Sequence, residues 1–197
     1  MDTKSLLKID CLREAAASYG SSPYCFGLGF IQLKLSDQAR MHFWHMAVPH
    51  VEREEIHNHR YDFTSVILAG ALRQELYHVR PGHATFEPII QSEWEMFETT
   101  CAPGEEGAVT TTQPVEVISL GAVNLAKGSN YSLPITAFHT TEGTDFAITF
   151  LRRGEKVKQF AEIVKLKGAP TTCPFANPGT PEDCWEMIKL ALDYAKL

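Results

Sequence analysis

The two ends of the chain have the spacing of amphipathic helices. Near the N-terminus apolar residues recur at steps of three and four, and Gly20 stands where a glycine would end the helix. Near the C-terminus Thr180 suits the N-cap position and Pro181 the first turn. An apolar stripe follows, and we expect it to pack on the domain rather than on a partner. The two stripes are Leu6, Ile9, Leu12 and Ala16, then Trp185, Ile188, Leu192 and Ala195.

Short extended segments fill the region between the two predicted helices. Gly and Pro separate segments rich in β-branched and aromatic residues, which favours a barrel or sandwich of many short strands. A polar turn at 36–38 predicts a hairpin between the first two segments. We expect a helix at 1–20 packed on a barrel at 21–165, then a linker and a helix at 166–197. The extended segments are 26–35, 41–48, 61–79, 85–90, 94–100, 115–125 and 145–151.

Composition narrows the classes of function. A chain of 197 residues with 44% hydrophobic residues fits one domain that needs no metal for stability, so a metal would indicate function. The net charge of −6 argues against a nucleic acid partner. No apolar run approaches the roughly 20 residues of a membrane helix. The five cysteines form no C-x-x-C pair and no signal-peptide pattern precedes them, so we expect a cytoplasmic protein.

His57 and His59 are the first candidates for chemistry. Residues two apart on a strand point to the same side, so the two imidazoles would converge on one point. Imidazole nitrogens bind iron, nickel, copper and zinc about 2 Å away. An H-x-H pair alone is a weak signal, because solvent-facing histidine pairs are common.

The surrounding residues resemble the motifs of the cupin superfamily. Gly70 lies eleven residues after His59, as in the first cupin motif, and Pro134 and His139 match the second motif, with Thr136 in place of its Gly. The resemblance implies a mainly β fold, a cupin-type double-stranded β-helix barrel (jelly roll) with the metal inside. The long separation of the two motifs predicts an inserted hairpin or loop at about 80–115.

The Glu of the first cupin motif is missing here. Asp62 and Glu75 are the nearest carboxylates, as a fourth ligand or behind the ligands, although strand parity turns Asp62 away from the histidines unless a bulge intervenes. A site of His57, His59 and His139 alone is the simplest proposal, and it leaves coordination positions open.

The resemblance extends to thiol dioxygenases, a cupin branch with a three-histidine iron site. It implies one divalent transition metal, with Fe(II) favoured and Zn, Ni or Mn as alternatives. Those enzymes also have a Ser-His-Tyr relay after the third ligand, and this chain has no histidine after His139. The H-x-H segment looks closer to a group of poorly characterised bacterial and phage cupins.

Other side chains are candidates for the cavity around the metal. Tyr61 shares the parity of the ligands, and Tyr131 belongs to the second motif. His42 and His45 lie on opposite faces of their strand, so only one of them can face the cavity, and His45 is a candidate. Arg73 is a candidate to hold a substrate carboxylate, as are Arg40 and Arg60, although a surface position is favoured for each arginine.

Three functions fit these observations. The first is a metal-dependent cupin that acts on a small molecule, in one form a non-haem Fe(II) dioxygenase. The second is a non-catalytic cupin that binds a small ligand or an interaction partner. The third is a metal-free sugar-nucleotide epimerase or isomerase, in which His57 or His59 would work with Asp62 and Tyr131. The first is favoured by fold analogy, and the superfamily makes a homodimer the default expectation.

Overall fold

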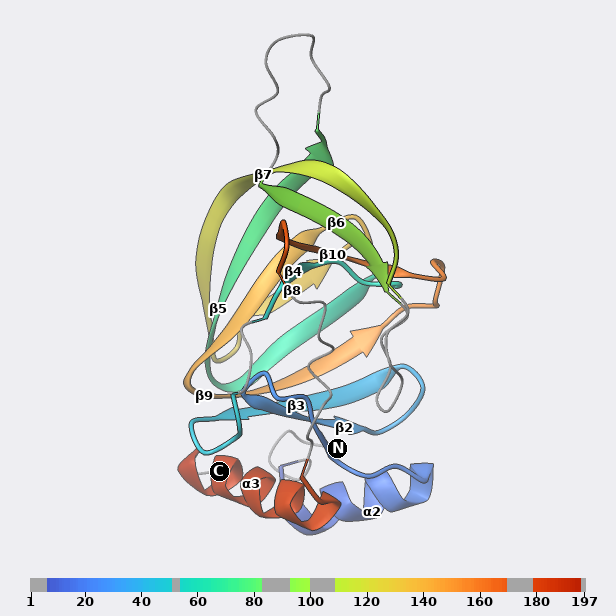
Figure 1. The fold of residues 1–197 in the computed structure, drawn as a ribbon. Helices are drawn as coiled ribbons and strands as arrows, with labels where there is room; N and C mark the ends of the chain where they lie inside the picture. The colour runs from blue at the N-terminus through green and yellow to red at the C-terminus, as the bar shows by residue number, and fades with distance from the viewer. Residues whose placement is uncertain (1–6, 51–53, 83–92, 100–108, 170–178, 196–197) are drawn as a thin grey trace, which may run out of the picture.

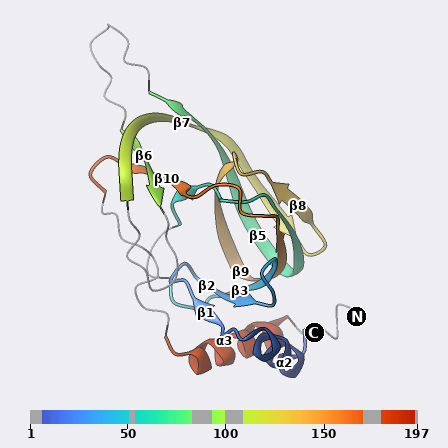
Figure 2. The same ribbon diagram turned by 90° about the vertical axis from the view of Figure 1, so that its right-hand side faces the viewer.

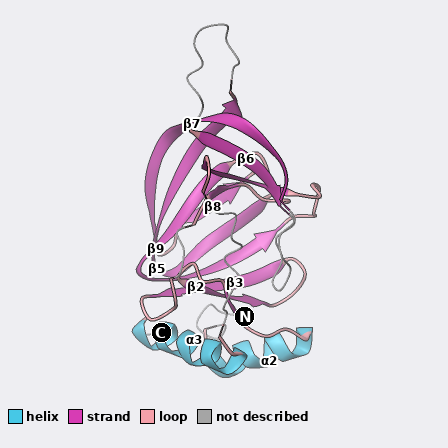
Figure 3. Ribbon diagram, viewed as in Figure 1, coloured by secondary structure: helices cyan, strands magenta, loops and turns pink. Residues whose placement is uncertain are grey.

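The computed structural model describes residues 7–50, 54–82, 93–99, 109–169 and 179–195. Strands dominate this part of the chain, and one helix lies near each end (Figure 3). The helices are α2 (Ile9–Tyr19) and α3 (Pro181–Tyr194). The strands are β1 (Tyr24–Cys25), β2 (Phe30–Lys34), β3 (Ala39–His45), β4 (Ile56–His57), β5 (Phe63–Pro81), β6 (Trp94–Thr99), β7 (Val109–Ala126), β8 (Asn130–Leu133), β9 (Phe138–Arg153) and β10 (Ala161–Leu166).

The strands form one antiparallel sheet that curves round on itself (Figures 1 and 2). Its order is β1-β2-β3-β9-β4-β10-β6-β7-β5-β8, and an additional pairing joins β9 to β5. The two long strands β5 and β9 pair along most of their lengths and so connect the two halves of the sheet. This architecture confirms the predicted mainly β, cupin-type barrel with helices at both ends.

Gly70 shows why the first motif contains a glycine. It lies between two irregularities in the pairing of β5 with β9, and its φ is +69°. A Cβ at this position would overlap the carbonyl oxygen of Phe146. A side chain would therefore be excluded both by the left-handed backbone and by the close approach of β9.

The two helices cover the outer side of the β2–β3 hairpin (Figure 1). The sequence signals at their ends are confirmed. Gly20 ends α2 with a φ of +72°, and Thr180 caps α3 in a capping box with Asp183. The α3 stripe is buried against the strands, with Ile188 fully enclosed, so it packs on the domain as predicted.

The remaining predictions have mixed outcomes. The β2–β3 hairpin is present, and Ser36 Oγ accepts hydrogen bonds from the backbone of its turn. A hairpin of β6 and β7 falls within 80–115, whereas the predicted strand at 85–90 lies outside the described residues. Neither described helix has the length and hydropathy of a membrane-spanning segment. The domain limits, the homodimer and the cytoplasmic location stay predictions.

Candidate metal centre

The three histidines of the two motifs meet inside the barrel. His57 lies on β4, His59 follows in the connection to β5, and His139 is the second residue of β9. His57 and His139 are direct partners across the β4–β9 pair. Their ring centroids are 4.5 Å apart, and His59 lies 4.9 Å from His57 and 5.1 Å from His139. One ring nitrogen of each histidine lies within 4.8 Å of the other two.

Apolar packing and backbone carbonyls orient these rings. Ile56 and Phe138, which precede His57 and His139, are buried in one apolar cluster. The Nδ1 atom of His57 lies 2.9 Å from the carbonyl oxygen of Glu55, and that of His139 lies 3.5 Å from the Ala137 oxygen. Nδ1–H donation to a carbonyl leaves Nε2 as the free lone pair, which is the tautomer that a metal ligand needs.

Burial keeps all three imidazoles neutral. It lowers the pKa of His57, and it lowers the pKa values of His59 and His139 well below the usual value. The neighbouring imidazoles lower the last two further, because two charged rings would repel each other. A neutral imidazole has the lone pair that binds a metal, so the cluster needs no proton release to accept an ion.

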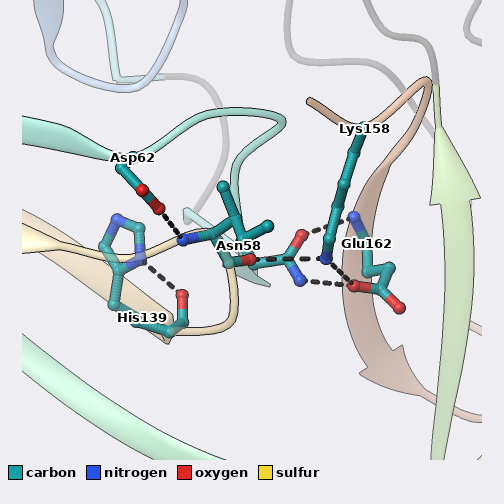
Figure 4. Close-up of polar contacts among 7 residues, drawn as sticks. Asn58, Asp62, His139, Lys158 and Glu162 are labelled. Carbon is teal, nitrogen blue, oxygen red and sulfur yellow. Dashed lines mark hydrogen bonds and ion pairs between the residues drawn. The ribbon is translucent and has the colours of Figure 1, made fainter. Parts of the chain in front are cut away.

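A polar network behind the histidines fixes the segment that carries them (Figure 4). Asn58, between His57 and His59, is 1% exposed and points away from the cluster. Its Oδ1 accepts from the Glu162 backbone N–H at 2.8 Å, and its Nδ2 donates to the Glu162 carboxylate. Lys158 Nζ lies 2.9 Å from the same carboxylate and donates to the Ile135 carbonyl at 3.3 Å. The network therefore ties β4 to β10 and to the turn that leads into His139.

The carboxylate of Asp62 also stabilises this turn, by a hydrogen bond to its backbone. Its Oδ1 accepts a hydrogen bond from the Ile135 backbone N–H at 2.7 Å, so the side chain lies with Ile135 rather than with the ligand nitrogens (Figure 4). Asp62 is exposed, as strand parity suggested. The His–Asp pair that a metal-free epimerase would need is not formed by His57 or His59 in this arrangement.

Glu75 and Arg73 lie on the outer surface of the barrel. Glu75 accepts from Ser119 Oγ at 2.7 Å and pairs with Arg73 at 3.2 Å. Arg73 also lies 3.6 Å from a carboxylate oxygen of Glu142. The hydrogen bond from Ser119 and the nearby arginine lower the pKa of Glu75, as expected for a paired surface carboxylate. The structure thus brings neither residue to the histidine cluster.

His42 faces the interior of the barrel, and His45 lies on the other face of β3. The ring nitrogens of His42 are 3.4 Å from Gln32 Oε1 and 3.4 Å from Thr149 Oγ1. Burial, with a smaller effect of the Arg40 charge, lowers the pKa of His42 to about 3. The ring of His45 instead packs 5.6 Å from Tyr194 of α3. Of the two alternatives that strand parity left open, the interior one is His42.

Both candidate tyrosines lie close to the cluster. The Tyr61 ring stacks on His59 with 5.5 Å between centroids. Tyr131 contacts Phe63 edge-on at 6.0 Å, and Phe63 contacts His59 at 4.9 Å. Burial raises the pKa of Tyr131, although the Ser65 hydroxyl partly opposes this shift. Its phenol therefore stays protonated at neutral pH and can donate a hydrogen bond.

One partly buried acid was not among the candidates from the sequence. Glu54 precedes β4 and accepts a hydrogen bond from the backbone N–H of Thr141, two residues along β9 from His139. Burial raises the pKa of Glu54 to about 8, so the carboxyl is largely neutral at pH 7. It lines a cavity of about 110 Å³ that Trp44 and His50 also line. Its sequence neighbourhood of charged residues gives no signal of burial.

The comparisons with known proteins give only remote likenesses. No family model matches the chain, and no curated protein matches it. The hydroquinone 1,2-dioxygenase from Sphingomonas sp. TTNP3, solved with 4-hydroxybenzoate bound, is 14% identical with a TM-score of 0.34, covering 79% of this chain and 78% of its own. The hydroquinone 1,2-dioxygenase PnpCD, in complex with Cd2+ and 4-hydroxybenzonitrile, is 13% identical with a TM-score of 0.33, covering 65% of this chain.

A third solved structure is the L-ribose isomerase of Cellulomonas parahominis, at 11% identity and a TM-score of 0.26, covering 97% of this chain and 69% of its own. The chain spans 59% of the length of the PnpCD chain that it matches. At these TM-scores the likenesses carry no argument about activity. The interpretation of the site therefore depends on its own geometry.

Proposed function

We propose that this chain is a metal-dependent cupin that acts on a small molecule and holds one divalent transition metal at His57, His59 and His139. The observation that carries the proposal is the convergence of three neutral imidazoles, with ligand nitrogens within 4.8 Å of one another, inside the barrel. Two motifs about eighty residues apart in the sequence supply them, and β4 and β9 pair at this point.

The residues present fit such an ion. Nitrogens that share one metal at about 2 Å are at most about 4 Å apart, so a small closing movement of the rings would complete the site. Two of the three rings already direct Nδ1 at a backbone carbonyl, as metal-bound histidines do. Three ligands on one side would leave positions open for a substrate.

The donor set favours metals that accept imidazole. Iron, zinc and nickel bind imidazole, whereas sites for magnesium and calcium consist of oxygen ligands. Among the metals that fit, Fe(II) comes first in our proposal because of the motif resemblance to cupin dioxygenases, with Zn, Ni or Mn as alternatives. A bound metal would supply Lewis-acid chemistry or, as Fe(II), the oxygen chemistry of a dioxygenase. The chain itself would orient the ligands through Asn58, and Phe63 and Tyr61 would limit the access of water to the rings.

Elemental analysis of the purified full-length chain, after reconstitution with Fe(II) without oxygen, tests the proposal. We expect near one equivalent of metal in the wild type and its loss in His57→Ala and His139→Ala. His45→Ala is the matched control, because this histidine lies on the far side of the sheet. Circular dichroism should show all variants folded, since the large apolar core between the helices and the strands contains none of these histidines.

A wild type that takes up no metal after reconstitution with Fe(II), or with Zn, Ni or Mn in parallel, would contradict the proposal. Retention of metal in both His→Ala variants would contradict it as well. The first result would leave the ligand-binding cupin without metal as the favoured function, and the second would move the metal away from these three histidines.

A further inference from the structure

Arg40 projects into the barrel beside the histidine cluster. It lies on the same face of β3 as His42 and Trp44, and its neighbour on β9 is Leu151. Leu151 is buried, with 6% of its surface exposed, so this part of the barrel wall is closed to solvent. Arg40 itself is only partly buried, so its side chain still reaches solvent. Sequence reasoning had favoured a surface position for this arginine.

Two contacts hold the guanidinium in place. Arg40 Nη1 donates to Gln32 Oε1 at 2.8 Å. Its Cζ lies 5.5 Å from the centroid of the Tyr61 ring, and that ring stacks on His59. A continuous row of contacts therefore leads from Gln32 through Arg40 and Tyr61 to a proposed metal ligand. The Gln32 bond leaves other N–H groups of the guanidinium free to bind a ligand.

No carboxylate among the described residues forms an ion pair with Arg40. After burial, the Tyr61 phenol is the neighbour with the largest effect on its pKa, which it raises, and the charges of Arg153 and Arg60 act in the opposite direction. Arg153 also lies over the Tyr61 ring at 5.1 Å. Burial is the main cause that lowers the pKa of Arg40, yet a guanidinium stays charged in proteins. A partly buried cation without an anion is costly, and a metal bound by three neutral imidazoles would add two more positive charges nearby.

We propose that Arg40 is the anion-binding group of the barrel interior and holds the carboxylate of a small organic acid, whose reactive end faces His57, His59 and His139. The proposal rests on the proposed function for the identity of the reacting centre, but not for the binding of the anion. A guanidinium binds a carboxylate through two parallel hydrogen bonds from two of its N–H groups. The hydrogen bond to Gln32 fixes the plane of the Arg40 guanidinium for such a pair. The aromatic rings of Tyr61, Phe63 and Trp44 suit an apolar body on the acid.

Arg73, the first candidate from the sequence, provides the matched control. It lies on the outer surface, where Glu75 and Glu142 already neutralise it. Because it faces solvent and has its own carboxylates, its substitution should leave ligand binding in the barrel unchanged.

Calorimetric titration of the full-length chain with benzoate tests the proposal, in metal-loaded and in chelator-treated protein. We expect saturable binding of benzoate and no binding of benzamide, the neutral isostere. Arg40→Gln should weaken benzoate binding roughly 10- to 100-fold, the usual effect of losing hydrogen bonds to a charged group. Arg73→Gln should bind as the wild type does, and both variants should keep the metal content of the wild type.

Arg40→Lys keeps the positive charge but cannot form two parallel hydrogen bonds, so it should lose less benzoate affinity than Arg40→Gln. It also keeps the test valid if Arg40→Gln does not fold. The absence of benzoate binding by the wild type in both metal states would overturn the proposal. Equal affinity of the wild type and both Arg40 variants, or equal binding of benzamide, would also overturn it. Arg40-dependent binding to a chain that takes up no metal would instead sustain this inference and contradict the proposed metal centre.

Discussion

The two faces of β3 have opposite characters. On the outer face Met41 and Phe43 are almost fully buried, in the apolar cluster that includes Ile188 of α3. On the inner face Arg40 and His42 bond to Gln32 of the neighbouring strand. One strand thus supplies both the packing that holds the helices and the polar lining of the barrel.

This difference separates stability from chemistry. Burial of a large apolar side chain stabilises the fold by roughly 1.5–3 kcal/mol. Polar groups turned inward gain little net stability, because each gives up its water for one or two hydrogen bonds. The inner face is therefore explained better by a ligand than by folding, and changes on the two faces should have different consequences.

The largest expected change in stability comes from removing a large apolar side chain from the outer face of β3. Phe43→Ala removes a fully enclosed ring between β3 and the helices and should lower the free energy of unfolding by about 3–5 kcal/mol. Urea unfolding followed by circular dichroism measures this loss. Any folded fraction should still bind the metal, because Phe43 points away from the histidine cluster.

Leu120→Ala on β7 is the control, since Leu120 is 64% exposed and its loss should change the stability by less than about 0.5 kcal/mol. A Phe43→Ala variant as stable as Leu120→Ala would show that the helices do not depend on this face of β3.

A smaller effect is expected behind the histidines. Asn58→Ala leaves the Glu162 backbone N–H without its acceptor and should cost about 1–3 kcal/mol of stability. Because Asn58 holds the segment between His57 and His59, metal affinity should also fall roughly 10- to 100-fold, as for other groups behind metal ligands. Competition with a chelator of known affinity measures the second effect.

Asn130→Ala, at an exposed position on β8, should change neither quantity. If Asn58→Ala lost stability but kept full metal affinity, the network would only join β4 to β10 and would not position the ligands.

The sequence predicted features that depend on local spacing. The helix ends at Gly20 and Thr180 follow from capping chemistry. His57 and His59 meet as the first motif predicted, but His59 lies beyond the end of β4, so strand parity is not what brings the two rings together. The meeting with His139 came from a motif resemblance, because nothing local in the chain brings β9 to β4.

Spacing could not tell which face of β3 is the inside. Both faces are covered, one by helices and one by the barrel, so hydrophobic alternation is weak and His45 looked as suitable as His42. Arg73 and Arg40 differ only in their partners, and those partners come from strands distant in the sequence. The position of the Glu54 carboxyl group depends on a hydrogen bond from one backbone N–H of β9, and no sequence pattern indicates that bond.

The effect that is smallest at neutral pH is the protonation of His42. His42 has a pKa of about 3 in the folded chain, against an ordinary value near 6.5. Between these two pH values the imidazole is protonated in the unfolded chain and neutral in the folded chain. Above about pH 6.5 both states are neutral at this group and it has no effect. As the pH falls from there towards 3, this one group should lower the free energy of unfolding by up to about 1.4 kcal/mol per pH unit.

His42→Gln removes this proton and keeps a side chain that can bond to Thr149, so urea unfolding between pH 6.5 and 4 should show a shallower loss of stability than in the wild type. The buried histidines of the cluster have lowered pKa values too, so the variant should keep part of the slope. Leu120→Ala is the control and should keep the slope of the wild type, because Leu120 is exposed and carries no titratable group. If His42→Gln kept the full slope of the wild type, His42 would not be buried inside the barrel, and the placement of Arg40 on the same inner face of β3 would fall with it.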